Sequence, residues 1–228
     1  MQVQDSTTLY LLKLWPWIEA NKNRLIAGTA AAVLVIFVIW FVVCHNESKE
    51  IAAGQALTQV VISSSAPTAD AFLKIATQQA GTAAAQRALL QGAAAFFGAG
   101  KFPEAQAQFQ KYLDAHPDGE FSGQAQLGVA ASIEAQGKTD LAAGAYQKVI
   151  STSSDAQVVS GAKFGLARIE ESQGRLNDAF ALYQDVANTS PGTSLGSEAA
   201  MRSIELKNKL PAPTPAPAPT PAAPLKQP

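Results

Sequence analysis

Small and apolar residues between positions 86 and 191 recur with a period of 37 residues. Each period contains a glycine, an aromatic residue and two alanines at fixed offsets. The aligned residues are Gly100, Gly137 and Gly174; Phe109, Tyr146 and Tyr183; Ala93, Ala130 and Ala167; and Ala105, Ala142 and Ala179. The glycine and aromatic sets are the more informative, because a chain rich in alanine aligns alanines readily by chance. The pattern therefore predicts three copies of one structural unit.

Each unit is predicted to form two helices joined by a tight turn. The glycine is followed by a basic residue and separates two runs in which apolar residues recur at helical spacing. The alanines allow two helices to approach closely, and the aromatic ring fills the next layer. One such hairpin cannot bury its apolar face alone, so we expect the units to stack into an all-α solenoid.

The units resemble tetratricopeptide repeats. The segments that match the second half of that repeat are Ala105-x3-Phe109 with Pro117, Ala142-x3-Tyr146, and Ala179-x3-Tyr183 with Pro191. The residues that match its first half are Leu89, Gly92, Ala93 and Phe96. The period is 37 residues instead of the usual 34, and Ser154 replaces the terminal proline of the second unit. The residues that stand where the family has an aromatic side chain are Leu89, Gln126 and Lys163.

A segment of 19 residues without a charge, Leu25 to Val43, precedes the repeats. As a helix it would be about 28 Å long, close to the ~30 Å hydrocarbon thickness of a bilayer. It therefore predicts a transmembrane helix. The basic residues before it are Lys13, Lys22 and Arg24, whereas only Lys49 follows closely, beside Glu47 and Glu50. The positive-inside rule then places the N-terminus in the cytoplasm and the repeats outside.

Two alternatives to an uncleaved anchor fit the segment less well. A cleaved signal peptide has an apolar region of about 7–15 residues and a small-x-small cleavage site, and neither is present. A lipoprotein would be modified at Cys44, but Phe41-Val42-Val43 lacks the small residues that a lipoprotein cleavage site has. We therefore interpret the segment as an anchor that stays in the protein.

The chain divides into six predicted parts. They are a basic cytoplasmic leader, 1–24; the transmembrane helix, 25–43; a degenerate capping hairpin, 45–82; three tetratricopeptide-like repeats, 83–194; a C-terminal capping helix, 195–210; and a disordered proline- and alanine-rich tail, 211–228. The capping hairpin is indicated by Phe72, which lies 37 residues before Phe109.

The two ends of the chain each have two interpretations. The leader is either a short amphipathic turn whose Trp15 and Trp17 lie at the lipid headgroups, or an unstructured tail. The segment after Pro211 is expected to be extended, in the polyproline-II manner. It is either a ligand or spacer, or, more simply, an inert solvated tail.

Composition and motifs favour a binding protein over an enzyme. The formal net charge is −1, so no overall field attracts nucleic acid, and a single cysteine excludes an internal disulfide. Neither His45 nor His116 has a spaced ligand partner, so we expect no metal and no cofactor. Glu170 and Glu171 are adjacent, and adjacent helical side chains point apart, which disfavours acid–base catalysis. We expect no small-molecule substrate.

The remaining candidate for function is the concave face of the solenoid, which the first helix of each unit lines. By resemblance to tetratricopeptide folds, Leu90, Leu127 and Phe164 form an apolar ladder there, suited to a peptide segment. The alternative is that these three side chains are buried between hairpins. The full set of candidate protein-binding residues is Arg87, Leu90, Phe97, Gln124, Leu127, Glu134, Phe164, Arg168 and Glu171.

The order of leader, single span and helical domain is similar to that of the YfgM-like family, ancillary subunits of the bacterial Sec translocon. This resemblance covers about residues 8–210, and the proline-rich tail lies outside the family's layout. It implies an adaptor in the bacterial inner membrane that faces the periplasm and meets the translocon, periplasmic chaperones or exported chains. The alternative is a scaffold for cell-envelope assembly or cell division.

Overall fold

The structure is a computed structural model that describes residues 4–63 and 67–210. The predicted proline-rich tail lies outside these residues. Every regular element in the described ranges is a helix. The helices are α1 (Gln4–Ser63), α2 (Ala69–Gln78), α3 (Ala83–Gly98), α4 (Phe102–Ala115), α5 (Ser122–Ala135), α6 (Thr139–Thr152), α7 (Ala156–Ser172), α8 (Leu176–Thr189) and α9 (Ser194–Lys209). The predicted all-α class and helical solenoid are confirmed.

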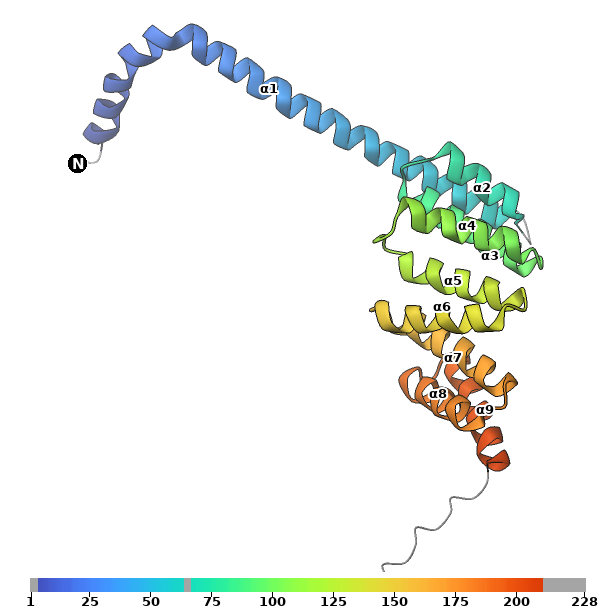
Figure 1. The fold of residues 1–228 in the computed structure, drawn as a ribbon. Coiled ribbons are helices and arrows are strands. Elements are labelled where there is room, and N and C mark those ends of the chain that lie inside the picture. Colours follow the sequence, from blue (N-terminus) through green and yellow to red (C-terminus); the bar gives the residue numbers. More distant parts are fainter. Residues whose placement is uncertain (1–3, 64–66, 211–228) are drawn as a thin grey trace, which may run out of the picture.

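Helix α1 is 60 residues long, which corresponds to about 90 Å of helix. Figure 1 shows a bend near its N-terminal end, in the part of the chain that contains Pro16. Proline lacks the N–H that continues the helical ladder, and its ring displaces the preceding turn. From Glu19 onward the helix is long and apolar enough to cross a membrane, and its most apolar window is not buried by any other part of the described chain.

The same helix also begins the solenoid. α1 continues past the apolar segment and packs against α2 and α3, where Ala53 is fully buried and Phe72 of α2 is nearly so. The Glu50 carboxylate accepts a hydrogen bond from the backbone N–H of Ala83, the first residue of α3, at 2.9 Å. The apolar segment and the first packing layer therefore share one uninterrupted helix. The predicted domain limits stay predictions.

The hairpins α3–α4, α5–α6 and α7–α8 stack in sequence, and α9 covers the last of them (Figure 1). Each helix packs on its neighbours along the chain, and α3, α5, α7 and α9 also contact one another in that order. These four helices form one layer of the solenoid. They correspond to the predicted first helices of the repeats and a terminal helix.

The three aligned glycines turn the chain inside each hairpin. Gly100, Gly137 and Gly174 have φ values of 74°, 76° and 77°, a conformation that glycine adopts at no steric cost. At each, the glycine N–H donates to the carbonyl three residues back, and the next N–H donates to the carbonyl five residues back. This pair of backbone hydrogen bonds is the Schellman motif, which ends a helix. The predicted turns are confirmed.

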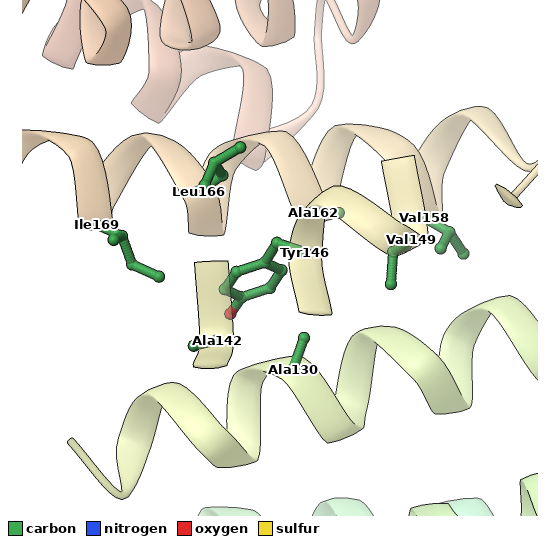
Figure 2. Close-up of a cluster of buried hydrophobic side chains, with 8 residues drawn as sticks. All are labelled: Ala130, Ala142, Tyr146, Val149, Val158, Ala162, Leu166 and Ile169. Atoms are coloured by element: carbon green, nitrogen blue, oxygen red, sulfur yellow. The ribbon is translucent and has the colours of Figure 1, made fainter. Parts of the chain in front are cut away.

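Aromatic rings fill the space between hairpins. Figure 2 shows the Tyr146 ring between Ala130 on α5 and Leu166 on α7, in a cluster of buried side chains. Ala130 and Ala142 have no exposed surface, so α5 and α6 approach closely beneath the ring. Tyr183 repeats this position one unit later and is also fully buried.

Two glycines inside helices allow these rings to pack against the backbone of the next unit. A Cβ atom at Gly165 of α7 would lie 2.4 Å from Cζ of Tyr146, and one at Gly128 of α5 would lie 2.6 Å from the Phe109 ring. Real Cβ atoms do not approach ring carbons so closely. Gly128 and Gly165 are 37 residues apart, so they belong to the repeat as much as the rings do.

We expect Gly165→Ala to lower the free energy of unfolding by about 1 to 3 kcal/mol, because the added methyl group overlaps the Tyr146 ring. The matched control is Gly144→Ala in α6, where an added Cβ meets no atom within 4 Å. This change should raise stability by about 0.5 to 1 kcal/mol, since it removes a helical glycine. Urea unfolding of the full chain in detergent, followed by circular dichroism, measures both. Equal effects of the two substitutions would contradict the packing described here.

Candidate protein-binding groove

A hollow of about 330 Å³ lies between α3 and α5 on the layer formed by the first helices. Equivalent turns of the two helices form its walls. Residues 87 to 94 of α3 and residues 124 to 131 of α5 are 37 positions apart, so they occupy the same place in successive units. The lining residues are Arg87, Leu90, Gln91, Ala94, Phe109, Phe121, Gln124, Leu127, Gly128 and Ala131. We call this hollow the groove.

Small side chains keep the groove open. Ala94 and Ala131 occupy equivalent positions on α3 and α5. One unit later the equivalent residue is Arg168, whose guanidinium lies over the Phe164 ring at 5.9 Å from the ring centroid. In the following unit, the long side chain of Arg168 therefore covers the position that alanine leaves free in the groove.

Four of the predicted binding residues line the groove. Arg87 and Gln124 are exposed at its rim, Leu127 is half-buried, and Leu90 forms part of the floor. The expected exposed ladder is wrong at two positions, because Leu90 is 6% exposed and Phe164 is 7% exposed. Leu90 packs with Phe109 in the first hairpin's core, and Phe164 packs edge-on against Tyr183 at 5.3 Å between ring centroids. A role for the nine residues in binding stays a prediction.

The other predicted residues lie outside the groove. Phe97 packs against Phe102 beside the first turn, with ring centroids 5.2 Å apart. Glu134 accepts hydrogen bonds at one oxygen from the Tyr146 hydroxyl at 2.6 Å and from Arg168 Nη2 at 2.7 Å. The structure therefore brings Glu134 and Arg168 together, but as an internal pair.

The Glu–Tyr–Arg arrangement occurs twice. The Tyr183 hydroxyl donates to Glu171 at 3.1 Å, and Arg202 of α9 lies 4.0 Å from the same carboxylate. In the first unit, Phe97 and Phe109 stand where the later units have glutamate and tyrosine. Both positions change from phenylalanine to a polar residue in the same units. This joint change was the signal in the sequence that could have revealed the hydrogen bond between glutamate and tyrosine.

The environment keeps these hydroxyls protonated and this arginine charged. Burial, and then the hydrogen bond to Glu134, raise the pKa of Tyr146 above its ordinary value of 10.0. Burial and Glu171 do the same to the pKa of Tyr183. Burial lowers the pKa of Arg168, but the charge of Glu134, the hydrogen bond to it, and Tyr146 and Tyr183 together outweigh burial, so the net pKa is raised. The polar groups of the later units thus bind one another. No such contact covers the groove between α3 and α5 within the described residues.

The groove combines an apolar floor with polar side chains at its rim, of which the glutamines both donate and accept hydrogen bonds. Arg87 lies over the Phe121 ring at 5.6 Å, and the carboxamides of Gln91 and Gln124 are exposed to solvent. No aspartate or glutamate is among the lining residues. Within residues 4–63 and 67–210, no cluster of three or more histidine, cysteine, aspartate or glutamate residues could hold a metal ion.

A larger hollow, of about 620 Å³, lies beside the loops that connect the units. Its walls include Asp118, Glu120 and Asp155, and the last of these caps α7 by accepting from the backbone N–H of Gln157 at 2.8 Å. Polar loop residues such as these suit a solvent-filled gap between units. We therefore take the smaller apolar groove as the candidate site.

A family model described as the protein kinase G tetratricopeptide repeat matches residues 51–209. The chain belongs to this family. The match begins where α1 enters the solenoid and ends with α9, so this tetratricopeptide-repeat region includes every helix that packs in the stack. No curated protein sequence matches the chain. The resemblance to tetratricopeptide repeats is confirmed.

The raised tyrosine pKa values predict a loss of stability in alkali. A group whose pKa is higher in the folded chain stabilises the fold fully below its unfolded pKa, which is 10.0 for tyrosine, and this contribution falls as the pH rises above that value. We expect the unfolding free energy to decrease as the pH rises above about 10. Urea titrations at several pH values measure it.

The double variant Tyr146→Phe with Tyr183→Phe removes both hydroxyls and should show a shallower decrease over the same pH range. A decrease of equal slope in the variant would mean that other groups cause the alkaline loss.

Proposed function

We propose that this chain is a membrane-anchored tetratricopeptide-repeat adaptor that binds segments of other polypeptides in the groove between α3 and α5. The observation that carries the proposal is the groove itself, with apolar walls and a rim of Arg87, Gln91 and Gln124, whose side chains form no ion pair or hydrogen bond within the described residues. Extended or helical segments bind such surfaces by inserting apolar side chains while their main chain bonds to the rim. The role is one of binding, without catalysis.

The size of the groove limits what it can hold. A volume of about 330 Å³ accommodates a few side chains of a segment rather than a folded domain. Leu127 and Phe121, both half-buried, would provide contacts that become fully covered when the segment is bound. We therefore expect recognition of short apolar segments.

The continuous α1 supports a position of this groove near the membrane. Ala53, where α1 packs into the solenoid, lies ten positions after Val43, the end of the apolar segment. As helix they span about 15 Å, so the domain would stand close to the lipid headgroups. Tethering at this height raises the local concentration of partners that are in or emerge from the membrane.

The flanking charges support an orientation in the bacterial inner membrane with the N-terminus in the cytoplasm and the repeats in the periplasm. The YfgM-like layout of the chain adds the class of partner to the proposal. These partners are subunits of the Sec translocon, periplasmic chaperones or exported chains that pass them.

Photo-crosslinking in intact membranes tests the binding surface. A photoreactive residue at Gln91 or Gln124, exposed at the groove rim, should capture translocon subunits, chaperones or exported chains. The matched controls are Gln147 of α6 and Gln184 of α8, which are exposed outside the groove. Equal capture from rim and control positions, or capture from none of them, would rule out the groove as the binding site.

Protease accessibility tests the orientation. We expect a protease added to spheroplasts to cleave the solenoid, and the same protease added to inverted membrane vesicles to leave it intact, because the positive flank holds the N-terminus inside. Immunoblotting with a serum against residues 83–194 shows which occurs. Protection of the solenoid in spheroplasts would contradict the proposed orientation and would mean that the repeats lie on the cytoplasmic side.

A further inference from the structure

The groove can donate hydrogen bonds to a ligand that offers acceptors, because Arg87 only donates and the carboxamides of Gln91 and Gln124 donate as well as accept. Within the described ranges Arg87 forms no ion pair, and the side chains of Gln91 and Gln124 form no hydrogen bond. The aromatic walls, Phe109 and Phe121, add flat apolar surface. A proline-rich segment has this chemistry, because each proline presents a carbonyl oxygen and an apolar ring but no N–H.

The chain itself carries such a segment. Residues 211–228 contain eight prolines in 18 residues, with no aspartate or glutamate. Proline-rich sequences favour the extended polyproline-II conformation before binding, so they lose little entropy when they enter an aromatic groove. Its charged side chain is Lys226, close to the end of the segment, so residues 211–225 bring no charge to Arg87.

The segment is long enough to reach the groove of its own chain. It follows Leu210, whose ψ of 141° already directs the backbone away from the helix. Helices α9, α7, α5 and α3 contact one another in order, and packed helices are about 8–10 Å apart, so the groove is roughly 25 Å from α9 across the layer. Eighteen residues at about 3.1 Å each extend over roughly 55 Å.

We propose that residues 211–228 bind in the groove between α3 and α5 of the same chain and compete there with external segments. The proposal rests on the groove being the polypeptide-binding site proposed above. A tethered segment has a high effective concentration, in the millimolar range for short flexible links, so even a weak interaction occupies the site. External segments must then displace the tail, which makes the adaptor selective for stronger ligands.

The first experiment compares the full chain with a chain that ends at Leu210, both with the anchor and in detergent. A fluorescent peptide of residues 211–228 is titrated, and anisotropy reports binding. We expect binding to the shortened chain, and binding about tenfold weaker or more to the full chain, whose own tail occupies the groove. A peptide with every proline replaced by alanine should bind the shortened chain about tenfold more weakly, because it regains N–H groups and flexibility.

Matched variants locate the site. In the shortened chain, Gln91→Glu with Gln124→Glu replaces two carboxamides, which donate and accept, by carboxylates, which only accept, and should weaken peptide binding about tenfold or more. Gln147→Glu with Gln184→Glu makes the same chemical change at exposed positions outside the groove and should leave binding unchanged. Circular dichroism checks that both double variants keep the helical content of the parent.

Three outcomes would overturn the proposal: no binding of the peptide to the shortened chain, equal binding to both chain lengths, or equal binding to the rim and control variants. Crosslinking from Gln91 and Gln124 separates this failure from that of the adaptor function. If external partners are still captured there, the groove binds polypeptides but the tail is not its ligand. A higher crosslinking yield after removal of residues 211–228 would support competition.

Discussion

The close approach of helices at alanine and glycine positions determines the rest of this structure. Ala130 and Ala142 let α5 and α6 lie against each other, and Gly165 lets the Tyr146 ring reach the backbone of the next unit. Because a ring from one hairpin fills the space beside the next, no hairpin completes its core alone. The stack is therefore cooperative between neighbours, as expected for a repeat protein.

The same distribution of side-chain sizes also makes the groove. Ala94 and Ala131 leave space on the layer of first helices, whereas the equivalent Arg168 fills it and is held there by Glu134. The first half of this layer is thus open and apolar, and the later half is occupied by charged pairs. The open groove and the charged pairs are therefore separated along one surface by changes of residue type at a few aligned positions.

Much of the fold followed from the period alone, because turn glycines and buried rings are specified by local geometry. The groove did not follow so directly. An apolar residue that repeats every 37 positions can face either a groove or the neighbouring hairpin, and only the packing distinguishes the half-buried Leu127 from the buried Phe164. Gly128 and Gly165 were missed because a glycine within a helical run looks like a weak helix former, and its partner ring lies in a different helix. The polar triads required knowing which residues from three helices meet.

Helix α1 joins the apolar segment to the solenoid without a break, and Glu50 fixes it to the start of α3. A helix that runs straight into a folded domain behaves as a rigid lever. Membrane helices change their tilt to match bilayer thickness. Under the proposed anchoring, a thicker or thinner membrane would therefore tilt the whole stack together with α1, and lipid composition would determine the height and direction of the groove above the bilayer.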